Sequence, residues 1–250
     1  MKQLGSFVSK VVICGVALSA VTLAVSARAE AKQGRATVQE VRGTADYSTG
    51  GGAFTALTTG ARLDAGTVIR TAAGSEVSLF LAQNGPVAVV RADTLLGLDR
   101  LSYDKTGAET VIDTRLDLKS GRVSGHVRKL AAASKYEVKI PNGVVSIKTA
   151  GAGTDYDIEV PGRTTVANGT ATMVYNNVNY SINSGQTFDP TIPGVRPATP
   201  PEIDGTKVPA VKPTVVAEVK PPEEFFVSPL VGGGAGRSEG GSDNGSDRGE

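Results

Sequence analysis

The feature that most constrains the fold is a repeated alternation of apolar and polar residues between positions 35 and 190. In four runs, 77–81, 135–140, 155–160 and 170–175, apolar side chains recur at every second position. Successive side chains of a β-strand point to opposite faces, so this period indicates strands with one apolar and one largely polar face. Such strands are typical of antiparallel sheets that bury one face.

Turn residues separate these runs about every 8 to 12 residues, the spacing of a β-sandwich or barrel. Asn-Gly pairs at 84–85, 142–143 and 168–169 each lie between two runs and predict hairpin turns, because both residues accept a positive φ. Further turns are expected at Gly60, Gly66, Gly74, Gly121 and Gly185. The sequence therefore predicts an all-β fold, an antiparallel sandwich or roll.

Helical signals are weak. Residues 95–103 could form a turn or two, and residues 127–134 contain the helix-favouring triplet 131–133. Both segments are short enough to be marginal as helices. We expect an aliphatic core with six aromatic members, which are Phe54, Phe80, Tyr136, Tyr156, Tyr175 and Tyr180.

The first 29 residues have the anatomy of a secretory signal peptide. Lys2 and Lys10 precede an apolar run of about 15 to 17 residues, and the small residues Ala27 and Ala29 form an A-x-A cleavage site. Cleavage after Ala29 predicts a periplasmic or secreted chain that lacks cysteine. The alternative is a membrane anchor at residues 11–27, although a span needs roughly 20 apolar residues.

Ten of the 13 prolines follow Asp189. Because proline lacks a backbone donor and restricts its predecessor, we expect residues 190–231 to be an extended linker without helix or strand. An acidic-apolar island at 223–227 is interpreted as a chance cluster or a short docking motif. The composition of residues 232–250 predicts a disordered tail. The β domain is therefore expected to occupy residues 30–189.

Composition excludes several kinds of site. A single cysteine and a single histidine exclude a disulfide framework, a cysteine-ligated zinc site and a histidine-rich metal site. A formal charge of +1 gives no electrostatic signature of nucleic-acid binding. The glycine runs 50–52 and 232–234 lack the Lys-Ser/Thr that follows a phosphate-binding loop. We therefore expect no cofactor, no metal and no nucleic-acid partner.

Three side chains could carry chemistry: His126, Asp155 and Asp157. The two aspartates lie two residues apart on a predicted strand and so share one face, where paired carboxylates can bind a cation or act as acid and base. Any nucleophile–histidine pair must include His126, yet no nucleophile-elbow motif surrounds it. The simpler interpretation is a polar strand residue and a solvated carboxylate face. We expect no catalytic residues and no enzyme.

A longer pattern of glycines and apolar positions resembles the FecR domain, an all-β periplasmic module. The resemblance covers roughly residues 36–188 and rests on the segments 57–79, 118–123, 136–147, 153–158 and 166–186. It implies structural roles for its motif residues, which are Gly60, Gly66, Thr71, Gly74, Gly121, Pro141, Gly143, Gly153 and Thr154. Residues 148–152 depart from the family, in which an apolar run leads directly into the Gly-Thr strand.

The resemblance implies an extracytoplasmic module used in sensing or in envelope proteins. Regulators of this family also carry a cytoplasmic sigma-factor-binding region, for which the few residues before Lys10 leave no room, so we do not expect that activity here. Our main hypothesis is a non-catalytic module that binds a protein or an envelope glycan. The alternatives are a structural envelope protein or secreted assembly component, a hydrolase built on His126 or the two aspartates, and a membrane-anchored signalling protein with an uncleaved first segment.

Overall fold

The structure is a computed structural model that describes residues 31–84, 87–149 and 151–209. The predicted signal peptide with Ala27 and Ala29, Gly85 of the first Asn-Gly pair, the island at 223–227 and the tail lie outside these residues. Within the described part of the chain, no helix has the length and apolar character needed to cross a membrane.

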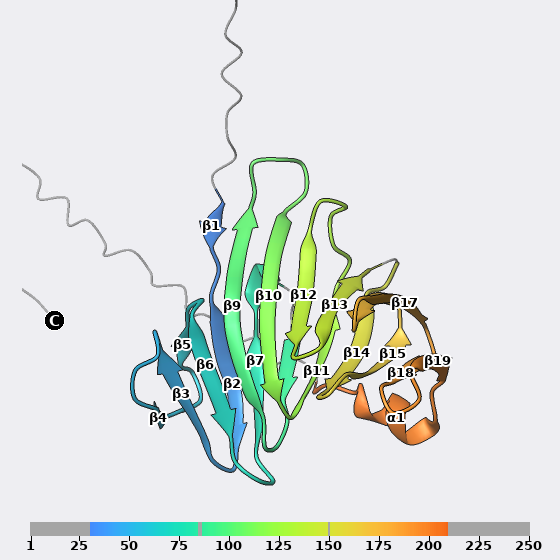
Figure 1. The fold of residues 1–250 in the computed structure, drawn as a ribbon. Coiled ribbons are helices and arrows are strands. Elements are labelled where there is room, and N and C mark those ends of the chain that lie inside the picture. Colours follow the sequence, from blue (N-terminus) through green and yellow to red (C-terminus); the bar gives the residue numbers. More distant parts are fainter. Residues whose placement is uncertain (1–30, 85–86, 150, 210–250) are drawn as a thin grey trace, which may run out of the picture. The chain divides into compact units, whose positions relative to one another are not determined.

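Two mainly antiparallel sheets face each other across one apolar core (Figure 1). Sheet A contains β1 (Lys32–Gln33), β3 (Ala45–Thr49), β4 (Thr55–Ala56), β6 (Thr67–Thr71), β9 (Leu95–Asp104), β10 (Val111–Ser120), β12 (Lys135–Ile140), β13 (Gly143–Lys148), β16 (Thr170–Tyr175) and β17 (Val178–Asn183). Sheet B contains β2 (Ala36–Arg42), β5 (Arg62–Leu63), β7 (Glu76–Phe80), β8 (Val87–Val90), β11 (Arg122–Val127), β14 (Thr154–Glu159), β15 (Arg163–Asn168), β18 (Gln186–Asp189) and β19 (Gly194–Pro197). A 3-10 turn (Ala82–Asn84) and the helix α1 (Pro200–Gly205) complete the described elements. The prediction of an all-β antiparallel sandwich is confirmed.

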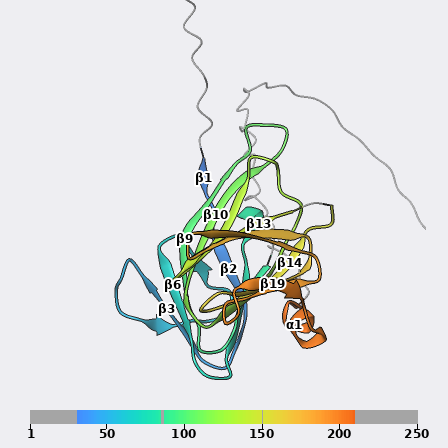
Figure 2. The ribbon, with the colours of Figure 1, turned by 45° about the vertical axis from the view of Figure 1, so that its right-hand side comes forward.

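From β9 onward the chain visits the two sheets in turn, as Figures 1 and 2 show. The hairpins β9–β10, β12–β13 and β16–β17 belong to sheet A, and β14–β15 and β18–β19 belong to sheet B. Strand order in this part of each sheet follows sequence order, so each hairpin is added beside the preceding one. Among the pairings of the described strands, only β10 with β12 is parallel.

At two of the crossings between the sheets, glycine is required. Gly169 has a φ of +85° and lies between β15 of sheet B and β16 of sheet A, so the predicted Asn168-Gly169 hairpin is wrong. A Cβ at Gly169 would lie 2.9 Å from the carbonyl oxygen of Gly153. Gly121 has a φ of +82° and lies between β10 of sheet A and β11 of sheet B. A Cβ at Gly121 would lie 2.5 Å from Cα of Thr94. A glycine with a positive φ is thus found where the chain changes sheets as well as in hairpin turns.

Of two tight hairpins, the sequence predicted one and not the other. The hairpin predicted near Asn142 is present, with Ile140 opposite Gly143 and Pro141 and Asn142 forming the turn. The β16–β17 hairpin turns at Asn176 and Asn177, which have φ values of +48° and +64°. This turn was not predicted, because Asn-Asn is a weaker turn signal than Asn-Gly.

The other motif residues also lie at bends and crossings. Gly60, Gly66, Gly74 and Gly153 all have positive φ between strands. A Cβ on Gly143 would collide with the carbonyl oxygen of Val174 on the adjacent strand β16. The hydroxyl of Thr71 donates to the carbonyl oxygen of Arg91 over 2.6 Å. The hydroxyl of Thr154 donates to the carbonyl oxygen of Lys148 over 2.8 Å, which ties the first residue of the unusual segment 148–152 to the start of β14.

The core is mainly aliphatic, and its aromatic members differ in part from the prediction. Tyr136, Tyr156 and Tyr175 are buried, whereas Phe80 and Tyr180 are only partly buried. Phe54 is 39% exposed, so its assignment to the core is wrong; the guanidinium of Arg70 covers its ring at 4.4 Å. The fully buried aromatic residue that was missed is Phe188, which lies between the rings of Tyr175 and Tyr180.

Both predicted helical segments are wrong. Residues 95–103 belong to strand β9, which pairs with β6 and β10 and gains a ladder of hydrogen bonds on each side. In 127–134, Val127 ends β11 and the alanines form a turn closed by the backbone of Ala131 and Ser134. Sheet pairing outweighs a weak local preference for helix.

The expectation that no helix or strand follows Pro190 is also wrong, because β19 pairs with β18 and α1 follows it. Pro197 is tolerated since it ends an edge strand, which needs no donor on its outer side. Pro200 and Pro201 occupy the first turn of α1, where backbone N–H groups have no partner within the helix. The folded region thus extends past Asp189, through α1.

Candidate functional site

The polar side chains of greatest interest lie on the outer face of sheet B, over β11, β14 and β15. Strand register places His126 opposite Asp155 and Asp155 opposite Asn168, and we call these three residues the groove row. The same register aligns four residues in a second line, here called the buried row: Ser124, Asp157, Thr165 and Thr187. The alternation of side chains along β11 and β14 puts both rows on one face.

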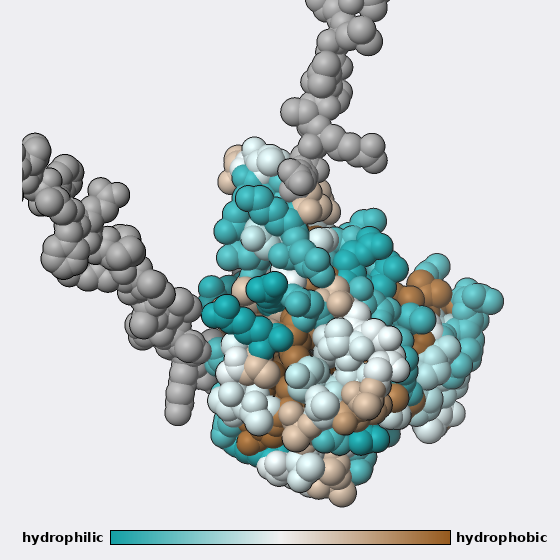
Figure 3. Space-filling model, turned by 90° about the vertical axis from the view of Figure 1, so that its left-hand side faces the viewer, coloured by the Kyte–Doolittle hydropathy of each residue, from teal (hydrophilic) through white to brown (hydrophobic). Residues whose placement is uncertain are grey.

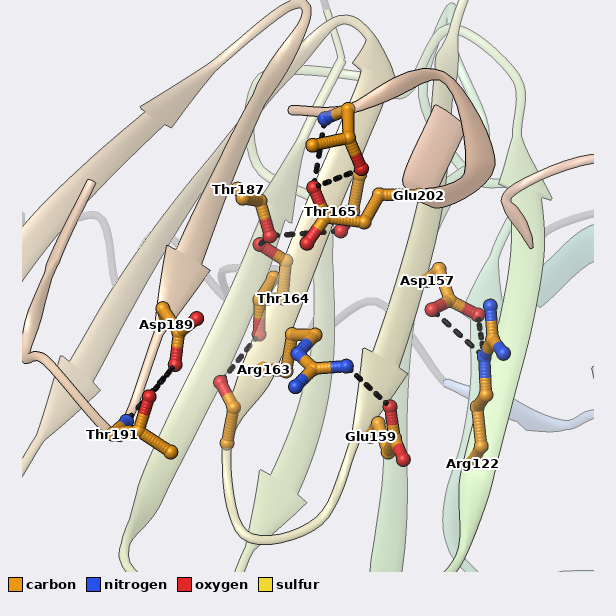
Figure 4. A network of polar contacts seen from close by, with 12 residues as sticks. Arg122, Asp157, Glu159, Arg163, Thr164, Thr165, Thr187, Asp189, Thr191 and Glu202 are labelled. Carbon is orange, nitrogen blue, oxygen red and sulfur yellow. Dashed lines mark hydrogen bonds and ion pairs between the residues drawn. The ribbon is translucent and has the colours of Figure 1, made fainter. Parts of the chain in front are cut away.

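The buried row is held by charge and hydrogen bonds. Nε of Arg122 donates to both carboxylate oxygens of Asp157, over 2.8 and 2.9 Å, and Figure 4 shows the two side chains facing each other. The hydroxyl of Ser124 donates to Asp157 over 2.7 Å, and Nε of Arg91 donates to Ser124 over 3.0 Å. The interpretation of Asp155 and Asp157 as a solvated face is wrong for Asp157, which is only 3% exposed.

Burial raises the pKa of Asp157 above its ordinary value, against the opposing effect of Arg122 and Ser124. Loss of water penalises the charged carboxylate more than the neutral acid, and the ion pair recovers only part of that penalty. Asp157 is therefore a structural group engaged by its neighbours, rather than a second free carboxylate beside Asp155.

The segment that covers the buried row is α1 together with the residues after it. The backbone N–H of Thr199 donates to Glu202 over 2.7 Å, and the Thr199 hydroxyl donates to the same carboxylate over 2.9 Å. Arg196 on β19 pairs with Glu202 over 2.7 Å, and these contacts lower the pKa of Glu202 to about 2. The short helix is thus fixed at its start by a charge-assisted cap.

The end of α1 is fixed by the same arginines that engage the buried row. Nη2 of Arg91 donates to the carbonyl oxygens of Gly205 and Lys207, over 3.4 and 3.0 Å. Gly205 lies so close to Arg122 that a Cβ would collide with the guanidinium. Residues 200–207 are therefore held on sheet B by side chains that the sequence patterns did not single out.

The groove row remains accessible beside this segment. Nδ1 of His126 lies 2.6 Å from Oδ1 of Asp155, and Nδ2 of Asn168 donates to Oδ2 of Asp155 over 2.6 Å. A groove of about 510 Å³ opens over the row. One wall is sheet B and the other is the C-terminal segment, and the lining comprises Val87, His126, Arg128, Asp155, Ala167, Asn168, Ile203, Thr206, Lys207, Val208 and Pro209.

The groove combines a histidine–carboxylate pair with a largely apolar wall. No hydrogen bond reaches Nε2 of His126 from the described residues, and the one hydroxyl side chain in the lining, Thr206, donates to the carbonyl oxygen of Ile203. In the same part of the chain, no three His, Cys, Asp or Glu side chains gather as metal ligands would. The groove thus offers hydrogen-bonding groups and apolar contact for a bound molecule.

A second groove of about 490 Å³ lies on the other side of α1 and is lined in part by Glu76, Arg91, Arg122 and Asp204. Glu76 forms an ion pair with Arg91, which also holds the C-terminal segment. The charged groups that line this second groove are therefore already engaged by other groups of the protein.

The structure brings together two of the three residues singled out from the sequence, His126 and Asp155, and separates Asp157 into the buried row. Asn168 was assigned to a hairpin turn, so its contact with Asp155 was missed. This contact could be predicted only once β14 was known to pair with β15, because that pairing places Asn168 opposite Asp155. The C-terminal wall was missed because the proline-rich segment was expected to be an extended linker without helix or strand.

Comparison of the chain with protein-family models, with curated proteins and with solved structures finds no match. The resemblance to the FecR domain therefore stays a prediction from the sequence motifs.

Proposed function

We propose that this protein is an exported, FecR-like module of the cell envelope that binds an extended protein segment without catalysing a reaction. The observation that carries the proposal is the groove over His126, Asp155 and Asn168. Export is supported by the Lys–apolar–Ala27/Ala29 pattern of the first 29 residues, and the module type by the all-β sandwich together with the FecR-like motifs.

A protein segment fits this groove better than a glycan does. The lining has apolar side chains on the C-terminal wall and a few convergent polar groups on the sheet, the usual combination in a binding site. Apart from His126, none of the described residues that line it is aromatic, so it lacks the Trp, Tyr and Phe rings on which sugars commonly stack.

The test is capture from an envelope extract by the purified protein and two variants. Asn168→Arg places a bulky cation in the groove, and Thr58→Arg places the same side chain on an exposed turn in the part of the sandwich formed by β2–β5. We expect a protein that is retained by the wild type and by Thr58→Arg and is lost with Asn168→Arg. A binding profile that is unchanged in Asn168→Arg, or a partner released by competing oligosaccharides, would contradict the proposal.

Export is tested separately. Mass spectrometry of the protein purified from its native cells should find a chain that begins at Glu30. A chain that retains residues 1–29 would favour the membrane-anchored alternative.

A further inference from the structure

Strand β17 (Val178–Asn183) is the last strand of sheet A and pairs on one side only, with β16. Its residues are mostly exposed, and the side chains of Asn179, Ser181 and Asn183 lie on the outer face. An edge strand of this length presents a row of free backbone donors and acceptors, which can template pairing with another strand.

The other ends of the described sheets are protected and β17 is not. The edge strands β4 and β5 have two residues each, and β19 has four, of which one is Arg196 and one is Pro197. Short length, charge and proline are the usual ways by which proteins prevent edge pairing. β17 has six residues and carries neither a charge nor a proline.

The sequence on either side of β17 is also uncharged. No Asp, Glu, Lys or Arg occurs between Arg163 and Asp189, in a chain of which 20% of the residues are charged. Val174 and Val178, on either side of the hairpin turn, are 42% and 49% exposed. A neutral strand can pair with an identical strand without opposing like charges, so a second copy of the chain meets no electrostatic barrier here.

The hairpin geometry identifies the free backbone groups. In a two-residue hairpin the pair next to the turn, Tyr175 and Val178, exchanges hydrogen bonds, and such pairs then alternate along the strands. The N–H and C=O groups of residues 179, 181 and 183 therefore point away from β16. Asn183 is already engaged, because its N–H donates to the side chain of Gln186 over 2.9 Å. Asn179 and Ser181 remain as the free positions.

We propose that two copies of the protein pair through β17 in an antiparallel arrangement with twofold symmetry. The buried faces of both copies lie on the same side of the joined sheet only if each residue pairs with itself or with a residue an even number of positions away. The free backbone groups of both Asn179 and Ser181 are used when this pairing is centred on Tyr180. Tyr180 then lies opposite Tyr180 of the second copy, and Asn179 lies opposite Ser181. The ten-stranded sheet A becomes continuous across both copies.

The arrangement closes at two copies. A fibre would need a second adhesive edge at the opposite end of the sandwich, where β4 and β5 are too short to extend a ladder. Figure 3 views the side of the molecule that carries β3 and β4, where hydrophilic and neutral colours predominate and apolar colours form separate areas. Pairing of identical surfaces around a twofold axis therefore gives a dimer.

The test uses paired charge variants and analytical ultracentrifugation of the full chain as purified from cells. The wild type should sediment with twice the monomer mass. In the double variant Asn179→Lys/Ser181→Lys, each lysine faces a lysine of the second copy, so this variant should be monomeric. The double variant Asn179→Glu/Ser181→Glu should be monomeric for the same reason. An equimolar mixture of the two variants should restore the dimer, because each lysine then faces a glutamate; a variant that simply misfolds would not be rescued in this way.

The matched control is Thr55→Lys/Ala56→Lys, which adds the same charges to β4, the edge strand at the other end of sheet A. This variant should remain a dimer. A monomeric wild type at its highest soluble concentration, a dimer that persists in both charge variants, or a mixture that stays monomeric would each overturn the proposal.

Discussion

At the scale of single residues, the steric limits on glycine differ among the places where the chain passes from one sheet to the other. Gly121 and Gly74 both occupy such crossings with positive φ, but only at Gly121 would an added Cβ lie within 3 Å of backbone atoms, those of Thr94 and Asp93. The two positions therefore separate the cost of an unfavourable φ from the cost of a collision.

We expect Gly121→Ala to lower the free energy of unfolding by about 3 kcal/mol, the sum of strain and overpacking. Gly74→Ala has open space around it and should lower it by only about 1 kcal/mol. Urea denaturation followed by circular dichroism measures both values. Equal losses in the two variants would show that the crossing at Gly121 relaxes without cost.

The buried carboxylate of Asp157 makes stability depend on pH. Its pKa is raised above the ordinary value of 3.8, so the folded protein binds this proton more tightly than the unfolded chain does. Stability from this group is therefore fullest below pH 3.8 and falls as the pH rises through the interval up to the raised pKa. Relative to Asp157→Asn, the wild type should lose unfolding free energy across that interval.

Thermal unfolding of the wild type and Asp157→Asn across this pH range measures the difference. An Asp157 pKa at or below 3.8 in an NMR titration would contradict the expectation, since it would mean that Arg122 more than compensates the burial.

At the scale of elements, helix α1 shows how a short segment becomes ordered through its contacts. Six residues are too few for a stable isolated helix. Glu202 ties α1 to Thr199 and to Arg196 on β19, and Arg91 holds the residues after it. The helix is therefore a product of its position on sheet B.

Glu202→Gln should destabilise the protein by about 1 kcal/mol at neutral pH, because it weakens the cap. The pKa of Glu202 is lowered from 4.5 to about 2, so its contribution is present above pH 4.5 and is lost as the pH falls toward 2. The difference between wild type and variant should shrink over the same interval. Chemical denaturation at several pH values tests this, with Glu109→Gln on an exposed loop as the control.

The elements that sequence patterns predicted well are those with strict alternation. Runs such as 135–140 and 170–175 form strands because one face meets the core and the other does not. Strand β9 was mistaken for a possible helix because all four of its residues from 95 to 98 are buried or half-buried, and such a run carries no clear period of two. Asn168-Gly169 was mistaken for a hairpin because a positive φ does not tell whether the next strand stays in the same sheet.

At the scale of the whole molecule, the C-terminal segment joins the fold to the candidate site. β19 extends sheet B, and residues 200–207 cover Asp157 and form one wall of the groove. The domain boundary expected at residue 189 would cut this segment away.

A chain ending after Pro209 should therefore be more stable than one ending after Asp189. The shorter chain exposes the buried row and leaves Arg91 without its partners Gly205 and Lys207, so its Tm should be lower by roughly 10 °C. Differential scanning calorimetry of the two chains measures the difference. Equal Tm values would show that β19 and α1 add nothing to the stability of the sandwich.

The sequence alone determined the fold class, because alternation and turn residues are local properties that each strand carries in its own residues. It also singled out His126, Asp155 and Asp157 as the side chains that could carry chemistry, although none was expected to be catalytic. Only the tertiary structure decided that these two meet, that Asp157 is buried against Arg122, and that a proline-rich segment forms a wall beside them. The two side-chain contacts join residues 29 and 35 positions apart, and they depend on which strands become neighbours, which no local pattern specifies.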